Sequence, residues 1–283
     1  MSEKASSTAA IATATLTRGY GLRSSLQYRF LVKRNRSLVR VLLPHTGRVQ
    51  FDHWVFHEGN LGPLARMGIR IASWPLRLKF VNLEDFFTNF KQERVAETQK
   101  RCPETILSSR FPAGYKAMCA FWTDEFLSYL GDYDVVFRID EDCVLKSLDF
   151  DKVFKPLIEG SVDYCAGTVF GLDAPDVTRG FEQFVIEWHE KNPETRAPTF
   201  DYNPYTNLFL LRPEALRSSP VPLSFLSHVR LSGCILGNRW GDHVIWGSLL
   251  SMYGETIKSN LEAEVSYFHG SHRAMVSHAY GAG

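Results

Sequence analysis

Residues 134–142 read Asp134-Val135-Val136-Phe137-Arg138-Ile139-Asp140-Glu141-Asp142. The run from Val135 to Ile139 is mostly apolar, with β-branched and aromatic side chains, which predicts a buried strand. Three acidic residues follow it directly. Because ligands in open α/β sheets bind beyond the carboxyl ends of the strands, these acidic residues are candidates for a ligand site. A solvated acidic turn is the alternative, since short acidic strings also arise by chance.

Strand-like apolar runs alternate with helical patterns on both sides of this segment, which is typical of an α/β fold. We expect further strands at 27–33, 53–57, 78–81, 164–170, 206–211 and 265–269. We expect helices at 35–43, at 114–130, after a cap at Asp176, from Pro213, and from a cap at Asp242 to Leu250. The polar stretch 89–101 is expected to form a surface helix or loop.

The first 21 residues are rich in Ser, Thr and Ala and poor in acidic residues. A targeting segment has a similar composition, but this stretch lacks an apolar signal core and a dense arginine pattern. We therefore expect residues 1–22 to be a disordered tail and residues 23–283 to form the folded domain.

The composition excludes some classes of protein. The chain has 283 residues, 45% of them hydrophobic, and a formal net charge of only +1. A nucleic-acid-binding protein would carry a basic excess, so we expect no nucleic-acid partner. No stretch approaches the roughly 20 apolar residues that cross a bilayer, so we expect no transmembrane segment.

The five cysteines are scattered and contain no Cys-x-x-Cys pair, which argues against a zinc site. We expect them to be free, buried side chains in a reducing compartment. This favours a cytoplasmic protein. The Golgi lumen is the alternative if a membrane anchor has been removed.

The acidic residues at 140–142 suit one kind of chemistry in particular. A nucleotide sugar carries a diphosphate whose charge must be neutralised before the anomeric bond breaks. Mg²⁺ or Mn²⁺ performs this task when one or two carboxylates and the phosphate oxygens hold it. The metal then stabilises the leaving diphosphate as a Lewis acid. Asp140 and Asp142 would supply hard oxygen ligands at a strand end.

Seven short blocks occur in the same order as in a known family. They are Val32-Lys33-Arg34-Asn35, Asp52-His53-Trp54-Val55-Phe56, residues 114–121 (Gly-Tyr-Lys-Ala-Met-Cys-Ala-Phe), residues 134–142, Tyr202-Asn203 with Thr206-Asn207, Arg239-Trp240-Gly241-Asp242 and Phe268-His269. In these blocks the chain resembles the fungal Golgi α-1,2-mannosyltransferases, which are retaining glycosyltransferases of the GT-A fold. The blocks span nearly the whole chain after the first 22 residues.

The resemblance implies a single α/β domain of GT-A type, with a mixed central sheet flanked by helices. It implies transfer of a sugar, mannose from GDP-mannose, onto a glycan hydroxyl with retention of configuration. The implied metal ligands for Mn²⁺ or Mg²⁺ are Asp140, Asp142 and His269. The implied nucleotide- and diphosphate-binding residues are Arg34, Asn35, Tyr115, Lys116, Glu141 and Arg239. Asp242 would face the sugar or acceptor hydroxyls, and with Asp140 and Asp142 it completes the implied catalytic set.

The chain departs from the family at one position that matters for mechanism. Where the family has a candidate nucleophilic glutamate, this chain has Phe209. We therefore favour a front-face substitution, in which the leaving phosphate accepts the proton of the acceptor. Two rivals remain: the same scaffold with another nucleotide-sugar donor, and a nucleotide-sugar-binding protein without catalysis. A nucleotidyltransferase is disfavoured, because residues 34–37 do not form a glycine-rich phosphate loop.

Overall fold

The structure is a computed structural model. It describes residues 8–17, 28–59, 61–92, 102–170, 173–254, 257–258, 261 and 264–270. His272, three residues after His269, lies outside the described residues.

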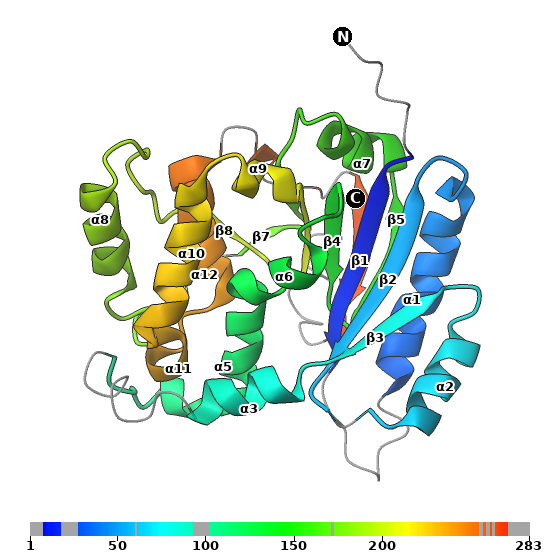
Figure 1. The fold of residues 1–283 in the computed structure, drawn as a ribbon, viewed down its shortest axis with the longest axis horizontal. Coiled ribbons are helices and arrows are strands. Elements are labelled where there is room, and N and C mark those ends of the chain that lie inside the picture. Colours follow the sequence, from blue (N-terminus) through cyan, green and yellow to red (C-terminus); the bar gives the residue numbers. More distant parts are fainter. Residues whose placement is uncertain are drawn as a thin grey trace, which may run out of the picture.

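One seven-stranded mixed sheet runs through the molecule, in the order β10-β6-β9-β4-β1-β2-β3 (Figure 1). The strands are β1 (Ala10–Thr17), β2 (Gln50–His57), β3 (Leu78–Asn82), β4 (Val135–Ile139), β6 (Tyr164–Ala166), β9 (Leu208–Leu211) and β10 (Ile257–Lys258). Strands β3, β2, β1 and β4 are mutually parallel, whereas β9 is antiparallel to both β4 and β6. Two smaller ribbons pair β5 (Cys143–Leu148) with β11 (Val265–His269) and β7 (Val169–Phe170) with β8 (Asn203–Pro204).

The strand β1 lies in the middle of this sheet, between β2 and β4. The prediction that residues 1–22 form a tail outside the fold is therefore wrong for Ala10–Thr17. Its small alternating side chains are buried on both faces of the sheet, with Ala12 and Ala14 on one face and Thr13 and Thr15 on the other. Alanine and threonine suit a central strand because helices pack closely against it, but the same composition resembles a tail in the sequence.

Helices cover both faces of the sheet (Figure 1). They are α1 (Tyr28–Leu42), α2 (Pro63–Ala72), α3 (Glu84–Gln92), α5 (Ala113–Ala120), α6 (Leu127–Leu130), α7 (Phe150–Ile158), α8 (Phe181–Lys191), α9 (Pro213–Arg217), α10 (Pro220–Ser232), α11 (Cys234–Asn238) and α12 (Asp242–Tyr253). Short 3-10 turns occupy Leu43–His45 and Ser108–Arg110, and a π-helical turn, Phe121–Glu125, joins α5 to α6. The helix expected at 114–130 is thus confirmed, with a π turn inside it.

The sheet separates two hydrophobic layers because side chains alternate along each strand. On one side, Val136 and Phe209 pack with the aromatic side chains of the π turn and α12. On the other, Val135, Phe137 and Ile139 pack with α1 and α7. The strands expected at 53–57, 78–81, 135–139 and 265–269 are confirmed within a few residues.

Four local expectations are corrected. The segment 27–33 is not a strand but the start of α1, whose buried residues recur at helical spacing from Leu31 to Leu42. The segment 164–170 is broken into β6 and β7 around Gly167, where a Cβ atom would lie 2.8 Å from the Tyr267 ring. Helix α8 begins after Gly180, whose φ of 76° favours glycine, and Asp176 does not cap it. The N-cap of α12 is Gly241, and Asp242 is the first helical residue.

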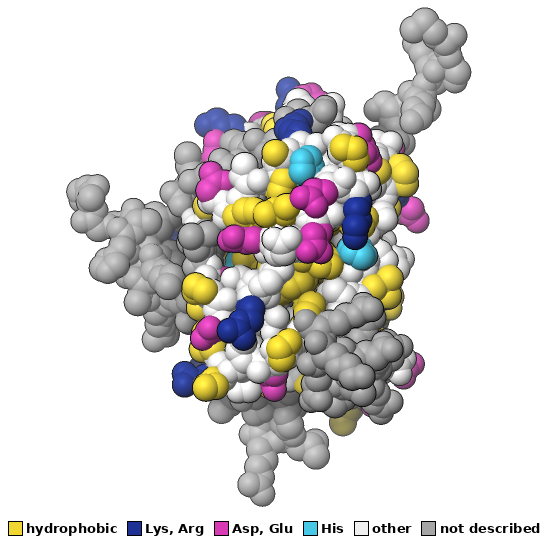
Figure 2. Space-filling view, turned by 90° about the vertical axis from the view of Figure 1, so that its left-hand side faces the viewer, with side chains coloured by type: hydrophobic (Ala, Val, Ile, Leu, Met, Phe, Trp, Pro, Cys, Tyr) yellow, Lys and Arg dark blue, Asp and Glu magenta, His cyan; other side chains and the backbone are white. Residues whose placement is uncertain are grey.

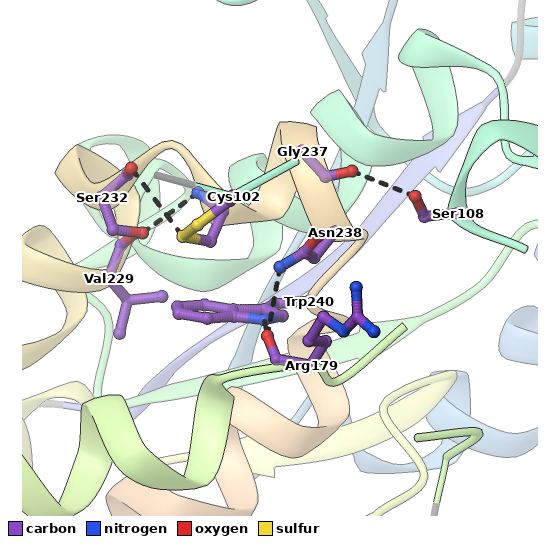
Figure 3. Close-up of a disulfide and its surroundings, with 9 residues drawn as sticks. Cys102, Ser108, Arg179, Val229, Ser232, Gly237, Asn238 and Trp240 are labelled. Atoms are coloured by element: carbon purple, nitrogen blue, oxygen red, sulfur yellow. Dashed lines mark hydrogen bonds between the residues drawn. A yellow bond between two sulfur atoms is a disulfide. The ribbon is translucent and has the colours of Figure 1, made fainter. Parts of the chain in front are cut away.

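Two of the five cysteines form a disulfide, so the expectation that all are free is wrong. Cys102 and Cys234 are bonded across 132 residues of sequence, with their Cα atoms 5.2 Å apart (Figure 3). This bond fastens the segment before α5 to the start of α11. Cys119, Cys143 and Cys165 are free and buried, as expected. Among the described residues, no helix has the length and apolarity needed to cross a membrane.

Candidate functional site

A cleft of about 540 Å³ opens beyond the carboxyl ends of β1 and β4. The parallel strands bring together loops that lie far apart in the sequence, as expected for an open α/β sheet. Acidic, basic and aromatic side chains surround it. The lining residues are Leu16, Phe30, Phe111, Tyr115, Met118, Arg138, Asp140, Glu141, Asp142, Asp173, Tyr205, Thr206, Asn207, Arg239, Asp242, His243, His269 and Gly270.

The acidic corner of the cleft is built by the turn between β4 and β5. The antiparallel pairing of β5 with β11 sets His269 opposite Cys143 and so beside Asp142. His269 Nε2 lies 3.1 Å from Asp142 Oδ1, and the Gly270 amide donates to the Asp142 carbonyl at 3.1 Å. The other ring nitrogen of His269 lies 3.3 Å from the Tyr205 hydroxyl. Contacts on both nitrogens fix the orientation of the imidazole.

This corner offers ligands that fit a divalent metal. Ligand atoms of Asp142, Cys143 and His269 all lie within 4.8 Å of one another. Burial raises the pKa of the Cys143 thiol well above its usual value, so at neutral pH it stays a protonated, poor ligand. Asp140 is not part of this group, but its carboxylate interacts electrostatically with both His269 and Asp142. Two carboxylates and an imidazole suit Mn²⁺ and, less well, Mg²⁺.

Burial and the neighbouring Asp142 and Asp242 carboxylates raise the pKa of Asp140, against the opposing effect of Arg138. Asp140 lies deep in the cleft, although 27% of its side chain is accessible. Such crowding of negative charge is costly without a cation. Arg138 supplies one cation to Asp140, and a bound metal ion would compensate more of this negative charge.

Glu141 turns away from the acidic corner toward the end of β1. Its Oε2 atom accepts a hydrogen bond of 2.5 Å from the Thr17 hydroxyl, and the residue is almost fully buried. Leu16 and Phe30 line the cleft beside it. This side of the cleft thus combines apolar surface with one carboxylate.

Arg138 is a buried cation behind the acidic corner. Its Nε donates to Asp140 at 3.1 Å, and its terminal nitrogen donates to Asp242 at 2.5 Å. The guanidinium stacks 4.4 Å from the centre of the Trp122 ring, which the π turn presents. Burial alone would raise the pKa of Asp242, but Arg138 and a hydrogen bond with Thr206 hold it below its usual value. Asp242 is therefore an anchored carboxylate.

A second ionic cluster forms the opposite wall. Arg239 pairs with Asp173 and donates to the Tyr115 hydroxyl at 3.1 Å. His243 Nε2 lies 3.2 Å from the same Asp173 carboxylate. The Arg239 guanidinium also lies 4.3 Å from the centre of the Phe111 ring. Arg239 has a left-handed φ of 64°, which is uncommon for a residue other than glycine and directs its side chain into the cleft wall.

The structure brings most of the expected site residues together, and leaves three outside. Asp140, Glu141, Asp142, Tyr115, Arg239, Asp242 and His269 all line the cleft. Arg34 and Asn35 do not line it: they lie in α1, where Arg34 donates to the Ala14 carbonyl at 3.3 Å and Asn35 to Ser73 at 2.9 Å. Burial lowers the pKa of Arg34 to about 9, and its charge acts on Asp140 and Glu141 from beneath the cleft. Lys116 is buried in an ion pair of 2.6 Å with Glu104.

Sequence reasoning missed several lining residues. Arg138 could have been recognised, because a charged residue interrupts an otherwise apolar strand there. Tyr205 and His243 are harder to recognise, since their only distinction in the sequence is that each adjoins a block shared with the family. Nothing in the sequence points to Asp173, because its partners Arg239 and His243 are far away in the chain.

Phe209, at the position of the family's glutamate, is fully buried and stacks on Tyr164 with ring centres 5.5 Å apart.

The sheet order, the helical layers and the cleft at the carboxyl edge are those of the GT-A glycosyltransferase fold, as expected. Ktr4p, a mannosyltransferase of S. cerevisiae, superposes with a TM-score of 0.72 at 15% identity over 92% of this chain and 70% of that one. Core-mannan synthase A (CmsA/Ktr4) of Aspergillus fumigatus, in its Mn/GDP form, gives 0.67 at 14% identity over 95% and 76%. Mouse xyloside xylosyltransferase 1 gives 0.53 at 14% identity over 88% and 84%. No protein-family model and no curated protein sequence matches the chain.

Proposed function

We propose that this chain is a metal-dependent glycosyltransferase that moves mannose from GDP-mannose to a hydroxyl of a glycan, with retention of configuration. The observation that carries the proposal is the contact between Asp142 and His269, 3.1 Å long, beside Asp140 in a cleft of a GT-A fold. A structural neighbour with this fold was solved in an Mn/GDP form, which supports both the metal and the nucleotide.

The cleft residues divide into four roles in this proposal. Asp140, Asp142 and His269 would hold Mn²⁺ or Mg²⁺, and the ion would supply positive charge to stabilise the leaving diphosphate. Glu141 and the apolar surface beside β1 bind the nucleoside, where a carboxylate can accept hydrogen bonds from ribose hydroxyls. Arg239, held by Asp173 and Tyr115, presents a guanidinium in the opposite wall whose N–H groups can donate hydrogen bonds to phosphate oxygens. Asp242 accepts hydrogen bonds from sugar or acceptor hydroxyls.

The route of substitution follows from the position of Phe209. Its side chain lies in the hydrophobic core and cannot attack the anomeric carbon. Asp242 is engaged by Arg138 and Thr206, so it serves poorly as a free nucleophile. We therefore propose a front-face substitution. The bond from the anomeric carbon to the diphosphate breaks, the acceptor oxygen bonds on the same face, and the leaving phosphate takes the acceptor's proton.

Thermal unfolding with a panel of nucleotide sugars tests the donor. We expect GDP-mannose to raise the melting temperature only with Mn²⁺ or Mg²⁺, because the diphosphate and the metal bind together. At a concentration about 100-fold above Kd, stabilisation is about 2.7 kcal/mol, which is several degrees for a chain of this size. If UDP-sugars shift the melting temperature and GDP-mannose does not, the donor is wrong but the scaffold stands. No shift with any nucleotide sugar contradicts the donor proposal altogether.

A matched pair of variants tests the metal site. Asp142→Asn should abolish transfer and weaken Mn²⁺ binding, measured by electron paramagnetic resonance, while the far-ultraviolet circular dichroism stays unchanged. Asp151→Asn is the control, because Asp151 is an exposed carboxylate on α7 with 61% of its side chain accessible. Normal turnover by folded Asp142→Asn with Mn²⁺ present contradicts the metal assignment. Binding of nucleotide and metal without any transfer would instead indicate a catalytically inactive binding protein.

A further inference from the structure

Helix α2 turns an apolar stripe toward solvent. Leu64, Met67 and Ile71 in α2 and Trp74 just after it are 79%, 52%, 71% and 80% exposed. Their spacing of three, four and three residues places them on one side of the helix. Nine large hydrophobic side chains are exposed among the described residues, and four of them lie in this one stripe. Clustering of this kind marks an interaction site, whereas isolated exposed hydrophobic residues do not.

The opposite face of α2 fixes the orientation of the helix. Ile69 is buried, and with Ala65 it packs in a small core with Leu31, Val55 and Leu78. Ser73 accepts a hydrogen bond from Asn35, and the Ala72 carbonyl accepts one from Arg36 at 3.2 Å. The helix is thus fastened to α1 and the sheet, so the apolar stripe cannot turn inward without breaking this core.

The segment of chain that carries the stripe is basic, although Arg34 in it is buried and Arg48 and Lys79 form ion pairs with Asp151 and Asp52. Residues 28–83 contain ten Lys and Arg but only two acidic residues, Asp52 and Glu58, for a net +8, whereas the whole chain has a net +1. Helices α1 and α2 contain no acidic residue. Arg66, Arg70 and Arg77 form no ion pair with any residue that the structure describes, and Arg70 and Arg77 are exposed. The face around α8 and α10, at the other end of the molecule, mixes acidic and basic side chains (Figure 2).

We propose that α2 and Trp74 dock on the surface of an anionic lipid bilayer. A helix with an apolar stripe, tryptophan beside it and arginines on its polar side lies in the plane of a membrane interface. Leu64, Met67, Ile71 and Trp74 enter the boundary between head groups and acyl chains. Arg66, Arg70 and Arg77 meet the lipid phosphates, where each cation adds to the attraction.

The charge pattern favours a bilayer over a second copy of the chain. A symmetric dimer through α2 would set the same arginines against each other. An anionic membrane instead neutralises them while it buries the apolar stripe. The chain enters α2 from the carboxyl end of β2 (Figure 1). The cleft opens beyond the carboxyl ends of β1 and β4, and β2, β1 and β4 are parallel. This proposal does not depend on which sugar the cleft binds.

Flotation of the full chain with lipid vesicles tests the proposal. We expect binding to phosphatidylcholine vesicles that contain phosphatidylserine, little binding to phosphatidylcholine alone, and weaker binding as NaCl is raised. Trp74 is the exposed one of the six tryptophans, so its fluorescence should shift to the blue on binding. Trp74→Phe should keep most of the binding and lose the shift.

Variants distinguish binding through the stripe from non-specific hydrophobic adsorption to vesicles. Ile71→Glu with Trp74→Glu should lower the partition coefficient by about tenfold or more. Ile106→Glu and Leu231→Glu, at exposed apolar positions elsewhere, should leave it unchanged. Arg70→Gln and Arg77→Gln should each lower it about fivefold, whereas Lys152→Gln on α7 should not.

Two outcomes overturn the proposal. One is wild-type protein that floats with neither kind of vesicle. The other is a folded Ile71→Glu, Trp74→Glu variant that floats as well as wild type. Sedimentation equilibrium tests whether a second copy of the chain covers the stripe instead. If wild type is a dimer, the double variant is a monomer and neither binds vesicles, the stripe is a dimer interface.

Discussion

Arg138 in β4 and Asp242 at the start of α12 are joined by a hydrogen-bonded ion pair of 2.5 Å, although 104 residues separate them. Both side chains are almost fully buried, with 2% and 7% accessible. The pair connects the strand that precedes the acidic corner to the helix that closes the cleft. It therefore positions Asp242 and, through the Arg138–Asp140 bond, the first of the proposed metal ligands.

We predict that Arg138→Met lowers the free energy of unfolding by about 3–5 kcal/mol, because it leaves the Asp242 carboxylate buried and unpaired. Urea unfolding followed by circular dichroism measures this loss. Lys152→Met, which removes one partner of an exposed pair with Asp149, is the control and should cost no more than about 1 kcal/mol. If Arg138→Met lowers the free energy of unfolding no more than the control does, the buried pair does not stabilise the structure around the cleft.

Phe209 provides a prediction about mechanism. Its ring packs against Tyr164 and Trp246, with ring centres 5.5 Å and 5.8 Å away. Phe209→Leu should lower stability by about 1–2 kcal/mol through loss of packing, while transfer per folded molecule falls by less than about tenfold. Phe209→Glu would place a carboxylate in the core beside Arg138, whose guanidinium carbon lies 5.6 Å from the centre of the Phe209 ring. There it competes with Asp140 and Asp242 for the same cation, so it should destabilise the chain by several kcal/mol.

Steady-state transfer assays and thermal unfolding of the two variants separate the explanations. A Phe209→Glu protein that folds normally and transfers sugar faster than wild type would show that this position reaches the donor. It would contradict the front-face route. If activity falls only in proportion to the amount of folded protein, Phe209 contributes to packing of the hydrophobic core and not to the reaction.

The central part of the fold was predictable because its signals are local. Val135–Ile139 is apolar and bounded by acidic residues, so both the strand and the site at its end can be recognised without knowledge of the rest. The helix at 114–130 is also predictable from local sequence, because its apolar residues recur at helical spacing. By contrast, β1 is built from alanine and threonine, whose burial depends on helices that pack from both sides. Nothing within Ala10–Thr17 itself distinguishes it from a polar tail.

The site was predictable to the extent that single blocks determine it. Asp140, Asp142 and His269 follow from strand ends and from the resemblance, and β5 and β11 bring them together. The Arg239–Asp173–His243 cluster could not be predicted, because its geometry depends on the left-handed turn at Arg239 and on contacts across 66 residues. Arg34 and Asn35 were misplaced for a related reason: assigning residues 27–33 to a strand put them at a strand end, whereas helix α1 buries them.

The last prediction concerns pH. His53 in β2 is almost fully buried, and its Nδ1 lies 2.7 Å from the Thr13 hydroxyl. Burial, together with the nearby Arg34 charge, lowers its pKa to about 4, compared with about 6.5 in an unfolded chain. Between these two pH values His53 is protonated in the unfolded chain and neutral in the folded chain. The stabilisation by neutral His53 is therefore complete above about pH 6.5 and is lost as the pH falls toward 4, by about 3 kcal/mol in all.

His53→Asn should remove this dependence, because asparagine can keep the hydrogen bond with Thr13 and does not titrate. Other groups titrate in the same range, so the decisive quantity is the difference between variant and wild type, from urea unfolding at pH 7 and at pH 4.5. Wild type should lose about 2–3 kcal/mol more than the variant over this interval. His45→Asn, at a half-buried position outside the sheet, should behave as wild type. Equal losses for wild type and His53→Asn would mean that the buried imidazole accepts its proton in the folded chain. Arg34 and its partners would then have to move apart at low pH.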